Sequence, residues 1–551
     1  MDFNRLLGLV IAFVPISLLS FGGGQATVPE IQHQVVAVHG WLTNEQFADL
    51  FAIARASPGP STLIVALIGY QVSGFLGAVV ATVAVFLPSS ILMYFAAAWW
   101  QRNKHNPVRI AIERGLAPID TDGELLMIKF EADFIAKHLE SWMPDQPVDP
   151  SLMTLGKNCY IHYEPKGVVV HLATWNAPYV IGFLPILGAL AAGNAAVLKP
   201  SELAPHSSTV IARIVAEAFP NGELQCVEGG AEVAQALLAC PFNHVFYVGN
   251  TQIGKLVMKA AADHCASVTL EMGGKNPSII CASTDIDETA MKTAWGRMCN
   301  GGQACIAPDY LLVHASIEDK FTAALAKELA LQYDPQGKGY AANPDYPVII
   351  NERHFNRVRG LIEDARAKGA KIIGGEYVPE RRLITPTIIS KVTPEMKVMQ
   401  EEIFGPVICV VPFKEREEVT RYVAAREKPL SLYIFSKDQA EIDYFIRHTT
   451  SGSTVVNHNV IQSGTNPYLP FGGVNTSGIG RMVGWHTFNE CSNARSVVVD
   501  GPALGDPRMY VAPLDDKYKK QIAGLLTGKP VPQGIVKAIH GVLKLKAAFS
   551  R

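Results

Sequence analysis

The sequence predicts an α/β protein preceded by an all-helical segment of membrane type. The α/β class rests on short β-branched runs near residues 168–174, 195–199, 244–248 and 267–271, which alternate with helical patterns. Such alternation is typical of a parallel sheet covered by helices. The membrane segment rests on the absence of any charged residue between Arg55 and Arg102, because one helix crosses a bilayer in about 20 residues. That run has room for two crossings, hinged near 74–77 or at Pro88.

Length and charge limit the number of folding units and the kinds of function that we expect. A chain of 551 residues exceeds one typical domain, so two or three folding units are expected. Its 48 Lys and Arg residues against 50 Asp and Glu residues leave a net charge near zero, which excludes the basic surface of a nucleic-acid-binding protein. The nine cysteines form no Cys-x-x-Cys pair and lack the spacing of a disulfide framework. Reduced thiols in the cytosol, with no metal site, are therefore predicted.

A further apolar segment, 6–21, is broken by Pro15 and closed by three glycines at 22–24. A cleaved signal peptide explains it less well, because Asp2 and Arg5 are its only leading charges and no small-residue cleavage site precedes polar sequence. Arg5 and the basic residues from Arg102 onward both favour the cytoplasm, which requires an even number of crossings, whereas three candidates are present. The sequence leaves three possibilities open: segment 6–21 is re-entrant, 47–54 adds a partial span, or the fragment inserts in some other way.

Three motifs in this region follow one another in a recognisable order: Ser20-Phe-Gly-Gly-Gly-Gln-Ala-Thr-Val-Pro29, Gly40-Trp-Leu-Thr43 and Ala56-Ser-Pro-Gly-Pro60. With them the chain resembles the amino-terminal half of the chromate transporter family over about residues 1–118. Members of that family carry two such halves or work as pairs of single-half chains. The resemblance implies an all-α transmembrane segment in contact with membrane lipid.

After Pro118 the composition becomes that of a globular protein. Thr121-Asp-Gly-Glu124 has the pattern of a capping box and predicts the start of a helix. Apolar residues recur on one face of this helix, as packing against a core requires. They are Ile128, Ile135, Leu139 and Trp142.

A dinucleotide site is predicted where the strand near 244–248 runs into a helix. Gly249 and Gly254 flank this turn, and glycines there let backbone amides approach a phosphate at a helix N-terminus. The Gly-x-x-x-x-Gly pattern alone is weak. The neighbouring strand, however, ends in Lys199-Pro-Ser-Glu202, which places a cation and a carboxylate where ribose hydroxyls would be held.

The clearest chemical signal is a pair of motifs, Glu271-Met-Gly-Gly-Lys275 and Gly301-Gly-Gln-Ala-Cys305. A thiolate attacks carbonyl carbon, and a nearby carboxylate activates the water that releases a thioester. The pair therefore predicts aldehyde oxidation, with Cys305 as nucleophile and Glu271 as base. Cys299, six positions earlier, is interpreted as a small buried residue.

Seven motifs in order give the chain a resemblance to the aldehyde dehydrogenase superfamily over about residues 120–551. They are Thr174-Trp-Asn176, Lys199-Pro-Ser-Glu202, Gly249 to Gly254, Glu271-Met-Gly-Gly-Lys275, Gly302-Gln-Ala-Cys305, Glu401-Glu-Ile-Phe-Gly-Pro406 and Pro470-Phe-Gly-Gly473. The residues at 305–310 and 398–403 are most similar to those of the class 3 group, which includes fatty-aldehyde and coniferyl-aldehyde dehydrogenases. The resemblance implies a Rossmann-like cofactor domain at 119–272, a catalytic domain at 273–455, and a return to the cofactor domain with an oligomerisation strand and tail at 456–551.

The same resemblance implies residue roles. Cys305, Glu271 and Asn176 would be catalytic, with the Asn176 amide and the Cys305 backbone N–H holding the oxyanion. Contacts to the cofactor, NAD or NADP, would come from Lys199, Glu202, Gly249, Asn250, Gly254, Glu402 and Phe404. Glu202 favours NAD without excluding NADP. Asn176 has an alternative interpretation as the cap of the helix that begins after Pro178.

The predicted function is NAD(P)-dependent oxidation of an aldehyde to a carboxylate by a membrane-associated enzyme whose active site faces the cytoplasm. The alternative is a chromate or anion transporter fragment fused to an inactive dehydrogenase scaffold. The resemblance also implies a homodimer formed through edge strands near 160–163 and 496–499. The lysine-rich tail after Ala512 is expected either to dock on the subunit or to lie at the membrane interface.

Overall fold

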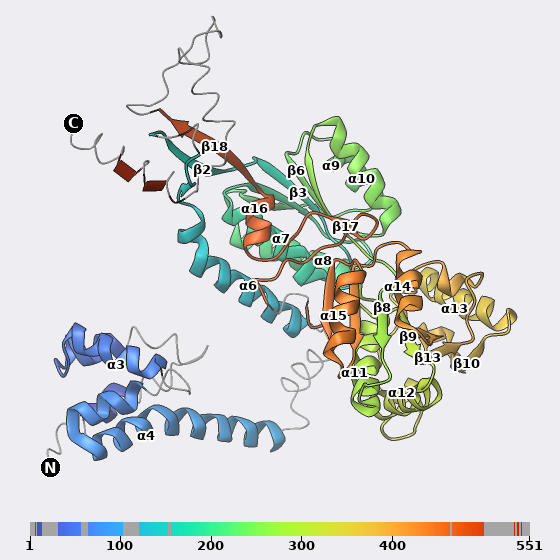
Figure 1. The fold of residues 1–551 in the computed structure, drawn as a ribbon, viewed down its shortest axis with the longest axis horizontal. Coiled ribbons are helices and arrows are strands. Elements are labelled where there is room, and N and C mark those ends of the chain that lie inside the picture. Colours follow the sequence, from blue (N-terminus) through green and yellow to red (C-terminus); the bar gives the residue numbers. More distant parts are fainter. Residues whose placement is uncertain are drawn as a thin grey trace, which may run out of the picture. The chain divides into compact units, whose positions relative to one another are not determined.

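The computed structural model describes residues 6, 8–13, 31–56, 64–102, 121–151, 154, 156–462 and 466–500, and residues 534, 537–538 and 541–542 of the tail. The chain divides into two compact units, residues 1–114 and 115–551. Figure 1 shows their elements in the order of the chain.

The first unit is helical within its described residues. It contains a π-helical turn η1 (His33–Val38), α3 (Asn44–Ala56) and α4 (Ile64–Arg102). A reciprocal capping box starts α3: Gln46 N donates to Thr43 Oγ1 at 3.2 Å, and Thr43 N donates to Gln46 Oε1 at 2.9 Å. Apolar side chains from all these helices form one core with Leu9, Ala12 and Phe13, and this core includes Val35 and Phe47.

Helix α4 is broken at its predicted hinge. Ser73 and Gly74 have non-helical backbone angles, and Gly74 has a φ of +64°. A Cβ added at Gly69 would collide with the Gly77 carbonyl oxygen, and one added at Gly77 would collide with that of Gly69. Eight residues of straight helix span about 12 Å, so this contact requires the two arms to fold back on each other. The prediction of a hinge near 74–77 is confirmed.

One helix among the described residues, Ile64–Val85, is long and apolar enough to cross a membrane. Two crossings were expected between Arg55 and Arg102. This candidate helix contains the break at Ser73 and Gly74, and the side chains after Val85 lie outside the described residues. Its first arm, 64–72, spans only about 13 Å, less than half of a hydrocarbon core of about 30 Å. The candidate segment 6–21 lies largely outside the described residues.

The second unit begins with α6 (Thr121–Trp142), the helix predicted from the capping-box pattern. Ile135 and Trp142 are buried on its predicted inner face, with Leu139 beside them. Glu124 is also buried, and its carboxylate accepts hydrogen bonds from the backbone of another helix.

A six-stranded sheet has the order β17-β7-β6-β3-β4-β5, and all four strands predicted in this region belong to it. Five strands are parallel, and the short β17 pairs antiparallel with β7. The bounds are β3 Val168–Leu172, β4 Ala195–Lys199, β5 Leu224–Cys226, β6 His244–Gly249, β7 Ser267–Met272 and β17 Gly478–Ile479. Parallel strands place the C-terminal ends of β6 and β7, and therefore Gly249 and Glu271, at one edge of the sheet.

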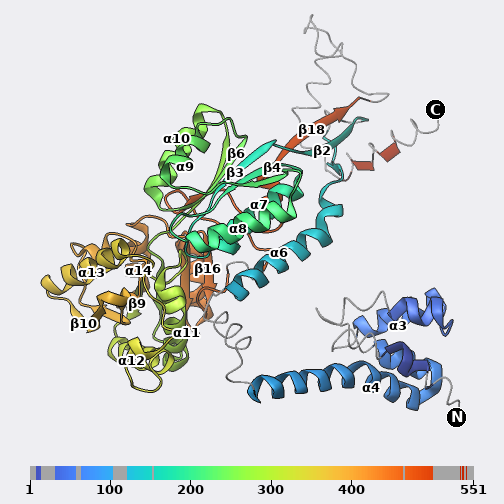
Figure 2. The same cartoon turned by 180° about the vertical axis from the view of Figure 1, so that it is seen from behind.

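Helices cover both faces of this sheet (Figure 2). Side chains of α7 (Pro178–Ala191) and α8 (Pro205–Ala218) form one apolar cluster with β4 and β5. Side chains of α9 (Ala231–Leu238) and α10 (Thr251–Asp263) form another with β3, β6 and β7 on the opposite face. The arrangement is the predicted α/β architecture.

A second sheet has seven strands in the order β10-β13-β14-β9-β8-β15-β16, all parallel except β10. The bounds are β8 Pro277–Ile280, β9 Tyr310–His314, β10 Lys371–Gly374, β13 Thr387–Ser390, β14 Val407–Phe413, β15 Ser431–Phe435 and β16 Ser453–Val456. Helices α11 (Ile286–Met298) and α12 (Glu318–Tyr333) pack on one face. Helices α13 (Glu352–Ala367), α14 (Arg416–Ala424) and α15 (Gln439–His448) pack on the other.

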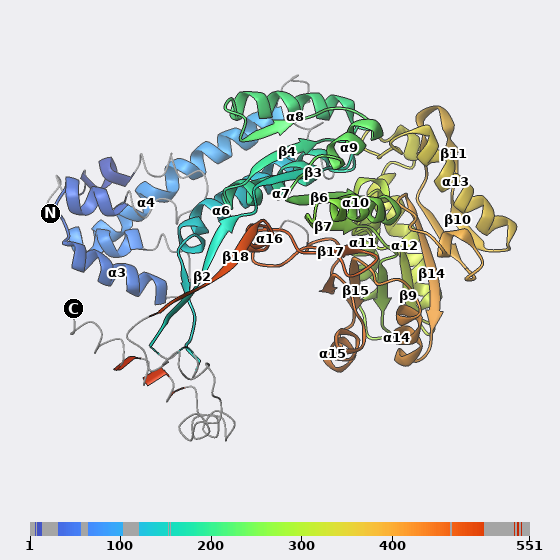
Figure 3. The same cartoon turned by 90° about the horizontal axis from the view of Figure 1, so that it is seen from above.

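A three-stranded antiparallel sheet extends away from the rest of the second unit (Figure 3). It consists of β1 (Gln146–Pro147), β2 (Asn158–Pro165) and β18 (Ser492–Val499), which follows α16 (Trp485–Glu490). The two predicted edge segments pair directly, with Ile161 opposite Ser496. Val498 is 58% exposed at the outer edge. One tail contact is described, an ion pair of 2.7 Å between Lys537 and Asp149.

Candidate active site

The structure brings the two predicted chemical groups together. Glu271 lies near the C-terminal end of β7 and is 2% exposed, whereas Cys305 follows α11 in a loop and is partly exposed. The Cys305 thiol donates a hydrogen bond to the Glu271 carboxylate. Oε1 of this carboxylate is buried without a partner by the geometric criterion for a hydrogen bond. A buried, half-satisfied carboxylate in contact with a thiol is rare in an ordinary core and marks a reactive site.

Both groups have perturbed acidities. Burial raises the pKa of Glu271 to about 7, and the hydrogen bond from Cys305 offsets part of that rise. Burial also raises the pKa of the Cys305 thiol well above its usual range, and the negative charge of Glu271 raises it further. The carboxyl group therefore titrates near neutral pH, while the thiol keeps its proton.

Consecutive left-handed residues shape the loop that carries Cys305. After α11 the chain forms a tight turn, η4 (Cys299–Gly302), in which Asn300, Gly301 and Gly302 have φ values of +49°, +62° and +75°. Glycine adopts such angles without strain, and a Cβ at Gly302 would collide with the Gly405 carbonyl oxygen. Cys299 is 1% exposed with a pKa raised by burial to about 12, as its interpretation as a small buried residue requires.

Two amide side chains fix the ends of this loop. Gln303 Nε2 donates to Asn300 O at 3.0 Å and to Val348 O at 3.1 Å, and its Oε1 accepts from Ile350 N at 3.0 Å. Asn276, fully buried, donates to Cys305 O at 2.7 Å and accepts from Ser431 N at 2.9 Å. The backbone of Cys305 is thereby tied to the strands of the second sheet.

Asn176 lies against the same loop. Its side-chain Nδ2 donates to Gln303 O at 3.0 Å, and its backbone carbonyl accepts from Asn300 Nδ2 at 2.8 Å. An amide group has two N–H donors, so this contact orients Asn176 and leaves a second N–H for a ligand. The interpretation of Asn176 as the cap of α7 is wrong, because the N-cap residue is Ala177 and no side-chain cap bond forms there.

The segment that carries Glu402 and Phe404 packs onto the loop after β7. Gly274 N–H donates to the Glu402 carboxylate, and a Cβ at Gly273 would collide with that carboxylate. Burial, followed by the charge of Asp309, raises the pKa of Glu402 to about 8. Phe404, with a φ of +47°, meets the Trp175 ring edge-on at a centroid distance of 5.6 Å.

Four charged side chains hold this segment in place, and the sequence analysis assigned none of them a role. Lys275 pairs with Asp309 and donates to Glu401 O at 2.9 Å, and Asp309 accepts from Ile403 N at 2.8 Å. The other two are arginines. Arg357 donates to Glu402 O at 3.1 Å and to Ile403 O at 2.6 Å, and buried Arg297 donates to Gly405 O. The backbone atoms that these four side chains bind lie far away in the sequence. Residue type and spacing do not reveal such contacts.

Removal of Asp309 is expected to be strongly destabilising. Lys275 and Asp309 are 13% and 2% exposed, so Asp309→Ala leaves a nearly buried ammonium group without its partner. We expect the free energy of unfolding to fall by about 3–5 kcal/mol. The matched control is Lys437→Ala, which breaks an exposed pair with Asp285 and is expected to cost less than about 1 kcal/mol. Denaturant unfolding of both variants checks this, and equal costs would contradict the role of the buried pair.

The predicted dinucleotide residues lie at the C-terminal edge of the six-stranded sheet. Lys199 is 4% exposed, and its ammonium contacts the half-exposed Glu202 carboxylate at 3.2 Å. Asn250 caps α10, since its side chain accepts from Ile253 N at 3.0 Å. A Cβ at Gly254 would collide with Met272 of β7, so this glycine lets the start of α10 approach the sheet closely. The structure thus presents a capped helix N-terminus after β6 and a Lys–Glu pair after β4. The prediction that these two strands are neighbours is wrong, because β3 lies between them.

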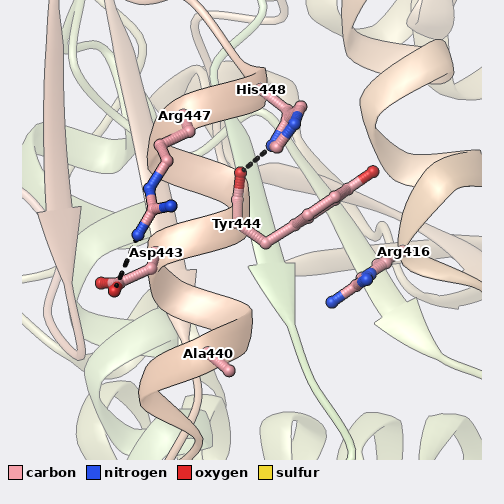
Figure 4. Close-up of a pocket in the computed structure, with 6 residues that line it drawn as sticks. All are labelled: Arg416, Ala440, Asp443, Tyr444, Arg447 and His448. Carbon is pink, nitrogen blue, oxygen red and sulfur yellow. Dashed lines mark hydrogen bonds and ion pairs between the residues drawn. The ribbon is translucent and has the colours of Figure 1, made fainter.

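A hollow between α14 and α15 contains none of these residues (Figure 4). Arg416 lies over the Tyr444 ring at 4.2 Å, and His448 stacks on the same ring at a centroid distance of 4.2 Å. Arg447 pairs with Asp443 at 3.2 Å. Arg416 and Arg447 thus already have partners among the residues that line the hollow. We assign the hollow no catalytic role.

Comparison with known proteins decides the family. The model of the aldehyde dehydrogenase family matches residues 88–497. The chain belongs to the aldehyde dehydrogenase family. A putative aldehyde dehydrogenase of Bacillus subtilis, AldX, is 42% identical over 66% of this chain and 81% of that protein. Aldehyde dehydrogenase family 3 member A2 of Macaca fascicularis is 41% identical over 68% of this chain and 75% of that protein.

Solved structures agree. Staphylococcus aureus AldH in a substrate-bound state superposes with a TM-score of 0.68 and 35% identity over 72% of this chain and 86% of that one. A second solved structure, a Sinorhizobium meliloti enzyme named NAD-dependent, has a TM-score of 0.63 and 29% identity over 70% of this chain and 76% of that one. Among the sequence relatives, a dog enzyme named dimeric and NADP-preferring is 40% identical over 70% of this chain and 83% of that protein. The cofactor of this aldehyde dehydrogenase is NAD or NADP.

The N-terminal part of the chain matches a second family. The chromate transporter family model matches residues 7–121, which confirms the predicted resemblance there. It overlaps the aldehyde dehydrogenase match, which begins at residue 88 rather than near the predicted start at 120. The protein therefore joins a transporter-type segment to an aldehyde dehydrogenase.

Proposed function

We propose that this aldehyde dehydrogenase oxidises its substrate through a thioester on Cys305, with Glu271 as the base. The single observation that carries the proposal is the hydrogen bond from the Cys305 thiol to the buried Glu271 carboxylate. A thiol with a raised pKa needs a base in contact with it, and a carboxyl group with a pKa of about 7 accepts a proton at neutral pH. Aldehyde-dependent formation of NAD(P)H by the purified protein tests the proposal.

The proposed steps use the side chains of Cys305, Glu271 and Asn176. Glu271 takes the thiol proton as sulfur bonds to the aldehyde carbon, and the oxyanion accepts hydrogen bonds from the Asn176 amide and the Cys305 backbone N–H. Bound NAD(P) supplies the acceptor for the hydride that leaves this carbon. Glu271 then releases the first proton to solvent, and the thioester is hydrolysed by water, whose proton passes to the ionised Glu271 carboxylate. The C–S bond then breaks, and a carboxylate and the free thiol are released.

The described residues suit a dinucleotide. Glu402, partly exposed and held by Gly274 N–H, would bind the nicotinamide ribose, with Phe404 beside the ring. Lys199 and Glu202 would bind the adenosine ribose, while the amides beyond Gly249 and Asn250 would face the phosphates. The close packing permitted by Gly254 keeps this helix start near the strand ends. Glu202, with half of its side chain exposed, favours a free 2′-hydroxyl.

The domain division and the oligomer are also proposals. A boundary near 272 is supported by the change of sheet between β7 and β8, and one near 456 by the end of β16. A homodimer through β18 is supported by its outer edge, where Val498 and Val499 are 58% and 47% exposed. An exposed apolar edge strand is a template for pairing with another chain.

We further propose that the protein is membrane-bound with its enzyme unit in the cytoplasm. The chromate transporter match and the apolar composition of Ile64–Val85 support attachment. The free cysteines of the described enzyme unit support a reducing compartment. We expect the full-length chain to sediment with membranes and to resist carbonate extraction. Complete recovery in the soluble fraction would contradict membrane insertion.

The rival function is transport by the front segment with an inert enzyme unit, and the chromate transporter match is the observation that favours it. The two functions separate in one experiment on cells that express the full-length chain. Aldehyde oxidation that requires Cys305 supports the enzyme. Chromate flux that survives Cys305→Ala, together with no aldehyde oxidation by folded wild-type protein, supports the rival.

A further inference from the structure

The N-terminus of α7, the helix that follows Asn176, depends on another helix for its hydrogen bonds. Its N-cap residue, Ala177, supplies no side-chain acceptor, and Pro178 has no N–H. Ile181 N donates to Ala177 O at 3.1 Å as the first intrahelical bond. Two donors of the first turn therefore need an outside acceptor, Tyr179 N and Val180 N.

One carboxylate oxygen of α6 accepts both. Tyr179 N and Val180 N each donate to Glu124 Oε2 at 2.8 Å. Glu124 is 4% exposed, so little water competes for these bonds. A carboxylate also interacts favourably with the positive end of a helix dipole, and charged acceptors form the stronger hydrogen bonds. The start of α7 is thus fixed to α6 by a charge-assisted contact.

The fixed turn adjoins the proposed oxyanion donor. Asn176 lies three residues before Tyr179, and its backbone carbonyl and side-chain amide are both engaged by the Cys305 loop. Asn176 is therefore held between that loop on one side and the start of α7 on the other. Small displacements of such a donor cost rate because oxyanion stabilisation depends on hydrogen-bond geometry.

We propose that Glu124 is a positioning residue for catalysis: through the first turn of α7 it holds the Asn176 amide where the oxyanion forms. This rests on the proposed thioester mechanism. Glu131 provides a matched control, because it is a buried carboxylate on the same helix, 3% exposed, that accepts from Gly484 N at 2.6 Å instead. The two residues are both buried glutamates of α6 but contact different backbone segments.

The experiment compares Glu124→Gln and Glu131→Gln in the full-length protein. We expect Glu124→Gln to lower kcat for aldehyde oxidation by about 10-fold or more, with the KM for NAD(P) unchanged within about twofold. Hydrolysis of p-nitrophenyl acetate, which acylates the thiol without hydride transfer, should fall in parallel. Alkylation of Cys305 by iodoacetamide forms no oxyanion and should keep its rate. Glu131→Gln should retain kcat within about threefold, and amide hydrogen exchange at 176–183 should accelerate only in Glu124→Gln.

Other outcomes overturn the proposal. If Glu124→Gln accelerates exchange at 176–183 but keeps kcat and ester hydrolysis, the contact serves stability alone. If both variants lose kcat equally, or if alkylation slows as well, the effect is a general loosening of the enzyme unit. A wild-type protein without aldehyde oxidation would instead refute the proposed function, and exchange and alkylation would still report on the Glu124 contact.

Discussion

Replacement of Cys305 by alanine is expected to reduce aldehyde-dependent NAD(P)H formation by roughly 10⁴-fold or more, the scale seen when a covalent nucleophile is removed. Cys305 is the cysteine whose thiol contacts Glu271, and its backbone is tied down by Asn276. Without the sulfur atom no thioester forms, so binding of aldehyde and cofactor no longer leads to turnover. Progress curves with a saturating aldehyde and each cofactor measure the loss.

Cys299→Ala is the matched control for this experiment. Its thiol lies six residues earlier in the same loop region, is 1% exposed and has a pKa of about 12, so it has neither access nor a base. We expect this variant to lose some stability through the small cavity, while kcat stays within a few-fold of wild type. Loss of activity in Cys299→Ala with retention in Cys305→Ala would reverse the assignment of the nucleophile.

The Glu271→Gln variant is expected to lose about 10²–10⁴-fold in steady-state kcat, the usual contribution of a general base. The first turnover should slow but persist to a greater extent than hydrolysis. Glu271 no longer takes the thiol proton, but loss of its negative charge lowers the pKa of the Cys305 thiol and lets solvent accept that proton. Hydrolysis of the thioester then lacks the carboxylate that accepts the proton of water. Rapid mixing should therefore show a burst of about one NAD(P)H per active site, followed by a slow phase. A variant that loses burst and steady state equally would show that Glu271 acts only before thioester formation.

Glu271 also sets the expected pH dependence. As a base it works in the ionised form, which becomes the major form above its pKa of about 7. Wild-type kcat should therefore rise with pH from 6 to 8, and the rise through about 7 should vanish in Glu271→Gln.

Sequence patterns predicted the chemistry because its residue types are rare and its motifs are local. A cysteine after two glycines and a glutamate at a strand end identified the pair, and the structure places their side chains in contact. The four strands of the first sheet followed from β-branched runs, and the hinge in α4 followed from its glycines.

The features that the sequence did not predict are long-range contacts between side chains and the backbone. Lys275 and Asp309 bind amides and carbonyls near residue 401, whose positions depend on the folded second sheet. Glu124 belonged to a predicted local capping box, yet its carboxylate accepts from the first turn of a helix about 55 residues later. Asn250 was predicted only as a cofactor contact, and its side chain is the cap of α10. No residue pattern specifies which distant N–H a buried carboxylate or amide will meet.

The most direct test of the thioester mechanism is mass spectrometry of the Glu271→Gln protein, quenched in acid after one turnover with aldehyde and NAD(P). The mechanism predicts that the peptide containing Cys305 carries the mass of the acyl group and loses it on treatment with hydroxylamine. An unmodified Cys305 peptide after a full burst of NAD(P)H, or an acyl group on another residue, would contradict it.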